Sequence, residues 1–231
     1  MSASQPERLT ITVGANHIVS GLFERPGAAR AVLVLAHGAG AGMEHPAIQS
    51  VTTGLTRRGV ATLRYQFPYM ERKSRRPDPP PLCHATVRAA VAEATRLAPD
   101  LPLFAGGRSF GGRMTSQAQA LAPLARVRGL VFLAFPLHPA GHPGTDRAAH
   151  LHEVGIPMLL IQGTRDELAD IELLRPLVQS LGGRATLHVL ENADHSFHVP
   201  ARSGRKDAEV REEALDAVCV WLDRLRGEAP G

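Results

Sequence analysis

Short apolar runs alternate with helix-length segments along most of this chain. Because the runs are continuous rather than interleaved with polar residues, they are typical of strands that are covered on both faces. Strands separated by helices require a mostly parallel sheet with right-handed crossovers. We therefore expect an α/β fold with three layers. The runs are AVLVLAHG from residue 31, VATLRYQF from 60, LPLFAGG from 101, VRGLVFLAF from 127, IPMLLIQG from 156 and RATLHVLE from 184.

Two further patterned segments, LTITV at 9–13 and IVSGLFER at 18–25, open the chain. A short turn separates them, which predicts an antiparallel hairpin. The expected sheet thus has eight strands with an antiparallel N-terminal edge. No shift in composition and no repeat divides residues 1–231, so we expect a single domain. Residues 138–155 are long enough for a short flap but not for a separate lid domain.

Helical periodicity marks two of the intervening segments, each of which would bury one stripe on the sheet. The first stripe is Val87, Val91, Ala94 and Leu97, and the second is Val210, Ala214, Val218, Trp221 and Leu225.

Composition excludes several classes of protein. With 44% hydrophobic and 21% charged residues, the chain is neither disordered nor fibrous. Its longest apolar stretches fall far short of the roughly 20 residues that a membrane helix needs. The N-terminus, MSASQPERLTITVG, lacks the basic and apolar regions of a signal peptide, so a cytoplasmic location is expected. Cys83 and Cys219 lie far apart in sequence and are expected to be reduced.

Neither charge nor histidine content indicates a nucleic-acid or metal partner. The 26 basic residues only modestly outnumber the 22 acidic ones, and no aromatic platform accompanies the densest cluster at 71–76. Four histidines at 138, 142, 150 and 152 share a loop without a cysteine or carboxylate cluster. Glycine-rich phosphate and dinucleotide signatures are broken at Arg113, Met114, Met43 and His45. We expect no cofactor and no metal.

The segment AGGRSFGGRM at 105–114 is the most informative motif. It places Gly107, Ser109 and Gly111 as G-x-S-x-G between an expected strand and an expected helix, as a nucleophile elbow requires. The serine hydroxyl would point out of a sharp turn. The N–H of Phe110 would face a developing oxyanion at the helix N-terminus.

A serine nucleophile needs a base and an orienting carboxylate. Asp166 follows the seventh expected strand and His195 follows the eighth, so both should lie at the sheet edge that carries the serine. The order Ser, Asp, His along the chain is that of a hydrolase triad. His198 competes with His195, and Asp170 and Asp194 compete with Asp166.

A second oxyanion donor is expected from the glycine-rich turn LAHGAGAGM at 35–43, where Ala39 is the first candidate and Gly40 the second. Four aromatic side chains fall at or just beyond strand ends, where a ligand crevice is expected. These candidates for an acyl pocket are Phe67, Tyr69, Phe135 and Phe197.

Together the segments HGAGAG, GRSFG, GTRDE and ADHSF resemble the α/β-hydrolase superfamily across nearly the whole chain. Within it, HGAGAGMEHP, FPYMER, GGRSFGGRM, PLHP and QGTRD are similar to the small group related to dienelactone hydrolase that includes testis-expressed and chromatin-complex-subunit hydrolase-like domains. Dienelactone hydrolase itself uses a cysteine nucleophile, whereas this chain has Ser109. The resemblance implies a triad of Ser109, Asp166 and His195 that hydrolyses an ester, thioester or similar acyl bond.

The leading hypothesis is thus a lidless serine hydrolase of the esterase or thioesterase type, acting on a small acyl substrate. The first alternative is a non-catalytic module that keeps the fold as a scaffold for a protein partner or for a second copy of itself. The second is an acyltransferase or carbon–carbon lyase that uses the same triad, because fold and triad do not fix the acceptor.

Overall fold

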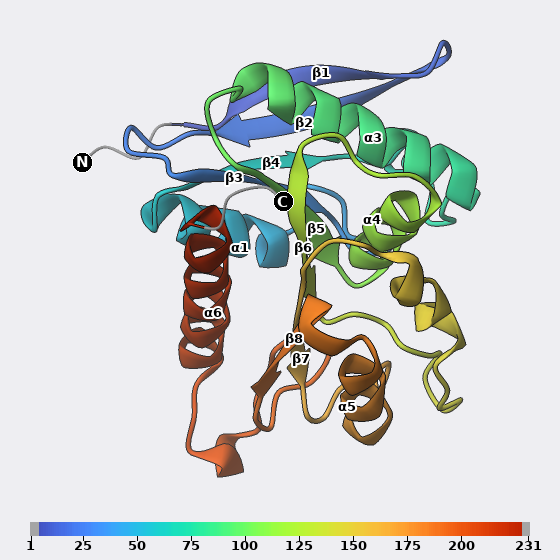
Figure 1. Ribbon diagram of the computed structural model, residues 1–231, viewed down its shortest axis with the longest axis vertical. Helices are drawn as coiled ribbons and strands as arrows, with labels where there is room; N and C mark the ends of the chain where they lie inside the picture. The colour runs from blue at the N-terminus through green and yellow to red at the C-terminus, as the bar shows by residue number, and fades with distance from the viewer. Residues whose placement is uncertain (1–4, 228–231) are drawn as a thin grey trace.

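The computed structural model describes residues 5–227 as one eight-stranded sheet between two layers of helices (Figure 1). All eight expected strands form. Their bounds are β1 Glu7–Val13, β2 His17–Glu24, β3 Ala31–Ala36, β4 Val60–Tyr65, β5 Leu103–Arg108, β6 Val127–Leu133, β7 Met158–Gly163 and β8 Ala185–Leu190.

The strand order is β1-β2-β4-β3-β5-β6-β7-β8. Strand β2 runs antiparallel to both β1 and β4, and all pairs from β4 to β8 are parallel. The antiparallel N-terminal edge is therefore confirmed. The chain moves outward from β3 to β4 and then returns to the other side of β3 with β5. Such a switch point opens a crevice at the carboxyl ends of the strands, where α/β proteins bind ligands.

Helices cover both faces of the sheet. Figure 1 shows α1 and α6 on one side of the strands, and α3, α4 and α5 on the other. Their bounds are α1 Pro46–Arg57, α2 Pro68–Glu71, α3 Pro80–Leu97, α4 Phe110–Leu121, α5 Ile171–Ser180 and α6 Asp207–Gly227, with short 3₁₀ helices η1 Asp146–Glu153, η2 Gly182–Arg184 and η3 Ala201–Ser203.

Alternate residues of the central strands pack into two separate hydrophobic cores, one on each face of the sheet. In β3, Leu33 and Leu35 pack in the core under α1 and α6, whereas Val32 and Val34 pack in the core under α3, α4 and α5. Every residue of β3 is buried, because both faces are covered. This explains the continuous apolar runs. Each large side chain buried in this way stabilises the fold by roughly 1.5–3 kcal/mol.

The two expected helical stripes lie on α3 and α6. On α3, Val87, Val91 and Ala94 are buried, while Leu97 is partly buried. All five stripe residues of α6 are buried, and the Trp221 ring packs 6.0 Å from that of Phe104 on β5. The periodicity therefore identified the correct faces of both helices.

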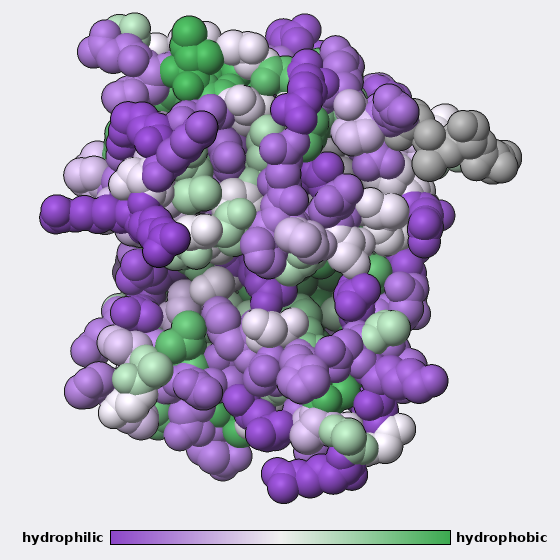
Figure 2. Space-filling view, turned by 180° about the vertical axis from the view of Figure 1, so that it is seen from behind, coloured by the Kyte–Doolittle hydropathy of each residue, from purple (hydrophilic) through white to green (hydrophobic). Residues whose placement is uncertain are grey.

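Most of the face shown in Figure 2 is hydrophilic, with hydrophobic side chains in scattered spots. No helix in residues 5–227 combines the length and the hydropathy needed to cross a membrane. Both cysteines are free and buried, and burial raises the pKa of the Cys83 thiol to about 12. Residues 138–155 form a loop and η1, which lies against α4, where His150 Nε2 is 2.7 Å from Ser116 Oγ.

Candidate active site

Ser109 lies in the sharp turn between β5 and α4. Its backbone has φ 50° and ψ −118°, a conformation that few non-glycine residues adopt and that marks functional turns. A Cβ on Gly107 would lie 2.7 Å from the carbonyl oxygen of Ala36, and one on Gly111 would lie 2.5 Å from that of His37. Only glycine fits at these two positions, because the turn packs directly against the backbone of β3.

The structure brings the three expected triad residues together. Ser109 Oγ lies 2.9 Å from His195 Nε2, and His195 Nδ1 lies 2.8 and 2.9 Å from the two carboxylate oxygens of Asp166. For Nε2 to accept the serine proton, Nδ1 must carry the other ring proton and donate it to Asp166. The Asp166 side chain is fully buried, whereas 26% of the His195 side chain is exposed. A substrate can therefore reach the imidazole but not the carboxylate.

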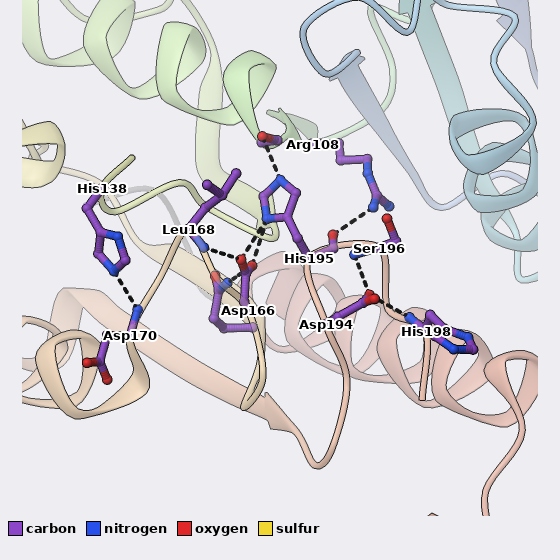
Figure 3. A network of polar contacts seen from close by, with 11 residues as sticks. Arg108, His138, Asp166, Leu168, Asp170, Asp194, His195, Ser196 and His198 are labelled. Carbon is purple, nitrogen blue, oxygen red and sulfur yellow. Dashed lines mark hydrogen bonds and ion pairs between the residues drawn. The ribbon is translucent and has the colours of Figure 1, made fainter. Parts of the chain in front are cut away.

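Three donors orient the Asp166 carboxylate. Besides the imidazole, Oδ1 accepts the backbone N–H of Leu168 at 2.8 Å, and Oδ2 accepts the side-chain amide of Gln162 (Figure 3). Gln162 is fully buried, and its Oε1 has no hydrogen-bond partner in the described chain. The Gln162 side chain therefore acts on this site as a donor, and its amide, the Leu168 N–H and the His195 imidazole together position the carboxylate.

The competing residues have other partners. His198 Nδ1 contacts the Asp207 carboxylate at 2.8 Å, and this hydrogen bond raises the pKa of His198. Asp170 caps the N-terminus of α5 by accepting the N–H of Glu172. Asp194 Oδ1 accepts two backbone N–H groups of its own loop, from residues 196 and 198.

The two backbone N–H groups expected to face an oxyanion, those of Phe110 and Ala39, have no acceptor within residues 5–227. A Cβ on Gly38 would lie 3.8 Å from the Cβ of Ser109, so the turn after β3 borders the nucleophile. The N–H of Gly40 donates to the Tyr69 hydroxyl at 3.2 Å. Among the hydrogen bonds within residues 5–227, none uses the N–H of Ala39 or of Phe110. Of the two turn residues considered, Ala39 therefore has the available donor.

The buried side chain of His37 contacts the backbone of this turn. Its Nδ1 lies 2.8 Å from the carbonyl oxygen of Gly38, and its Nε2 accepts the backbone N–H of Phe67 at 3.2 Å. This pairing requires a neutral ring. Complete burial lowers the pKa of His37 to about 4, so the ring stays neutral near pH 7.

Three of the four aromatic residues expected to line a pocket lie in the core instead. Phe67, Tyr69 and Phe135 have no exposed surface. The rings of Phe67 and Tyr69 pack 5.5 and 6.3 Å from that of Phe110, because α2 turns the segment after β4 back into the protein. They support the elbow rather than line an open pocket. Phe197, by contrast, lines a cavity with a volume of about 330 Å³.

Sequence reasoning missed Arg108, the residue before the candidate nucleophile. Its Nη2 donates to the backbone carbonyl of His195 at 2.8 Å (Figure 3). Its guanidinium lies 5.4 Å from the ring centre of Phe197. Burial lowers the pKa of Arg108, and the carboxylates of Asp166 and Asp194 oppose that shift. Arg108 thus links the turn that carries Ser109 to the loop that carries His195, which we call the histidine loop. Its place directly before the serine was the only available signal.

No group of three or more His, Cys, Asp or Glu side chains in residues 5–227 is arranged to hold a metal ion. Two of the four histidines that cluster in the sequence, His138 and His150, have different hydrogen-bond partners. His138, for example, accepts the N–H of Asp170 at 2.9 Å.

Solved structures share this fold. An α/β serine hydrolase homologue from Coxiella burnetii superposes with a TM-score of 0.75 at 20% identity, covering 94% of this chain and 100% of its own. A dienelactone hydrolase from Anabaena variabilis superposes with a TM-score of 0.73 at 23% identity, covering 92% of this chain and 97% of its own. A serine hydrolase without a lid from Xanthomonas campestris superposes with a TM-score of 0.71 at 21% identity, covering 100% of this chain and 99% of its own. At these identities the likeness establishes the architecture.

The sequence also matches a family model directly. The model describes an α/β-hydrolase domain and matches residues 29–223, which include every strand from β3 to β8 and all the candidate site residues. The chain therefore belongs to the α/β-hydrolase family.

Proposed function

We propose that this protein is a serine hydrolase that cleaves a carboxylic ester, a thioester or a related acyl bond through an acyl-enzyme on Ser109. One observation carries the proposal: the continuous hydrogen-bond chain from Ser109 Oγ through His195 to Asp166, at a strained turn. Family neighbours described as serine hydrolases and esterases support ester cleavage.

The first half of the reaction forms the acyl-enzyme. His195 Nε2 takes the hydroxyl proton as Ser109 Oγ attacks the carbonyl carbon, and Asp166 stabilises the resulting imidazolium. The carbonyl oxygen becomes an oxyanion that accepts hydrogen bonds from the N–H groups of Phe110 and Ala39. When the intermediate collapses, the bond to the leaving oxygen or sulfur breaks, and His195 gives its proton to that atom.

The second half releases the acid. His195 takes a proton from water as the water oxygen attacks the acyl carbon, and the ester bond to Ser109 then breaks with the proton returned to the serine oxygen. The exposed part of His195 allows this water to enter. The residues present supply every proton transfer, so the mechanism needs no cofactor.

Ester turnover tests the proposal. We expect the wild-type chain to hydrolyse p-nitrophenyl acetate and butyrate, with a rapid first turnover as the acyl-enzyme fills. Ser109→Ala and His195→Gln should lose that turnover while keeping the wild-type melting temperature. Turnover that persists in folded Ser109→Ala would refute the assignment.

Product analysis separates the alternatives. Hydrolysis gives the free acid even when an alcohol acceptor is present, whereas an acyltransferase gives the new ester. A folded wild-type chain that turns over no ester but retains a stoichiometric partner in a pull-down would favour the interaction module.

A further inference from the structure

A cavity of about 330 Å³ opens beside the loop that carries His195. It lies on the side of the sheet that α1 and α6 cover, and the side chain of Arg108 enters it because alternate residues of β5 face that side. Its remaining wall comes from the histidine loop. The lining residues are Pro46, Ala47, Ser50, Val51, Arg108, Ser196, Phe197, Asp207 and Arg211.

Arg108 brings a positive charge to this cavity without a direct counter-ion. Its Nη2 donates to a neutral carbonyl, that of His195. Among the ion pairs within residues 5–227, none includes Arg108, although the carboxylates of Asp166 and Asp194 act on it from a longer distance. Burial of a guanidinium costs free energy unless an anion or several acceptors compensate it. A group that accepts its remaining N–H donors would bind well here.

Arg211 adds a second positive charge from α6. The one acidic residue in the lining, Asp207, is already engaged: its oxygens accept from His198 Nδ1 at 2.8 and 3.0 Å and from the N–H of Val199 at 2.9 Å. Arg211 attracts Asp207 but forms no ion pair with it in the described chain. The cavity therefore presents two guanidinium groups and a carboxylate that already accepts hydrogen bonds from His198 and Val199.

We propose that this cavity binds an anionic group, a carboxylate or a phosphate, on the leaving half of the substrate. The inference rests on the proposed function and adds a substrate class to it. The two guanidinium groups match the planar or tetrahedral oxygens of such anions. The apolar surfaces of Pro46, Val51 and Phe197 would contact the carbon skeleton that carries the charge.

The chemistry assigns the cavity to the leaving half. His195 Nε2 must reach the leaving oxygen or sulfur to protonate it, so that half of the substrate lies against the imidazole. Ser196 and Phe197, the two residues directly after the histidine, line the cavity. A leaving alcohol or thiol that extends past His195 thus meets the two arginines.

Matched esters test this assignment. The substrates are 4-acetoxybenzoate and its neutral methyl ester, with 4-acetoxyphenyl phosphate as the phosphate counterpart. Arg211→Gln should lower kcat/KM for the preferred anionic ester about tenfold, as expected when one charge-assisted hydrogen bond is lost, and should change the value for the methyl ester by less than about twofold. Arg226→Gln, an exposed arginine at the other end of α6, is the control and should change neither value. The anionic ester with the higher kcat/KM identifies whether the cavity prefers a carboxylate or a phosphate.

Two outcomes would overturn the inference. One is an equal effect of Arg211→Gln on the charged and neutral esters, or no effect on either. The other is a selective effect on phenyl succinate relative to phenyl butyrate, which would assign the arginines to the acyl half.

A binding measurement keeps the inference separate from the proposed function. Calorimetry with 4-hydroxybenzoate and 4-hydroxyphenyl phosphate, using the Ser109→Ala chain, needs no turnover. Adding Arg211→Gln should weaken binding of the preferred anion about tenfold, even if the wild-type chain hydrolyses none of the esters. Failure of both compounds to bind, or unchanged affinity in the double variant, would contradict the proposal.

Discussion

Replacing Asp166 by Asn should abolish most catalysis while leaving the fold nearly as stable. In the wild-type chain, the two carboxylate oxygens accept from His195, from the backbone of Leu168 and from the amide of Gln162. An asparagine has one oxygen and one NH₂ group at the same place. If the NH₂ group faces the imidazole, Nδ1 must accept, the ring proton moves to Nε2, and Nε2 can no longer accept from Ser109.

The catalytic cost follows from the lost charge and the changed tautomer. The same replacement in a serine-protease triad lowers kcat about 10⁴-fold, which corresponds to about 5.4 kcal/mol of barrier at 1.36 kcal/mol per tenfold. The Asp166 side chain is fully buried, so water cannot replace the missing charge. We therefore expect a loss of about 10⁴ in kcat for p-nitrophenyl acetate.

The cost in folding stability should be much smaller. The Oε1 atom of Gln162 is buried and has no hydrogen-bond partner among residues 5–227, so rotating this amide would let it accept from the new asparagine NH₂ group. Because one hydrogen bond is exchanged rather than lost, the free energy of unfolding should fall by only about 1–2 kcal/mol. Urea denaturation measures that change, and initial-rate kinetics measures kcat.

Asp170→Asn is the matched control. Asp170 caps α5, where asparagine serves nearly as well as aspartate, so both kcat and stability should stay close to the wild-type values. If Asp166→Asn kept more than a tenth of the wild-type kcat, or if the control lost as much, the assignment of the triad carboxylate would be wrong.

Two predictions concern the scaffold of the site. Gly111→Ala should lower the free energy of unfolding by about 3 kcal/mol in urea denaturation, because its Cβ would lie 2.5 Å from a backbone oxygen. Gly144→Ala is the control and should leave the free energy of unfolding unchanged, because the space around Gly144 is open. Equal effects of the two substitutions would contradict this account. The pKa of His37 is about 4 in the folded chain and 6.5 when the ring is exposed. The contribution of His37 to the free energy of unfolding is therefore fully present above about pH 6.5, and about 3 kcal/mol of it is lost as the pH falls towards 4. His37→Gln should show a shallower fall in thermal or urea stability over that range, and an unchanged slope would refute the assignment.

Local sterics made much of the fold predictable. Continuous apolar runs identified the six strands from β3 to β8, because the central strands are covered on both faces, and two shorter patterned segments identified β1 and β2. The G-x-S-x-G motif located Ser109 because only glycine fits at positions 107 and 111. The ends of β7 and β8 then led to Asp166 and His195, since parallel strands share one carboxyl edge.

Side-chain direction and long-range contacts were not predictable in the same way. Phe67 and Phe135 lie near strand ends, as the sequence indicates, yet both point into the core. Arg108 contacts the backbone of His195, 87 residues away in sequence, and a backbone carbonyl leaves no trace in the residue pattern. The same holds for the Tyr69 hydroxyl, whose partner is the N–H of Gly40.

Covalent labelling of Ser109 tests the central claim most directly. Intact-mass spectrometry after incubation with a fluorophosphonate should show one adduct on the wild-type chain and none on Ser109→Ala, with both proteins folded by circular dichroism. Peptide mapping should place the adduct on Ser109. A folded wild-type chain that forms no adduct, or a Ser109→Ala chain that still forms one, would contradict the claim that His195 and Asp166 activate this serine.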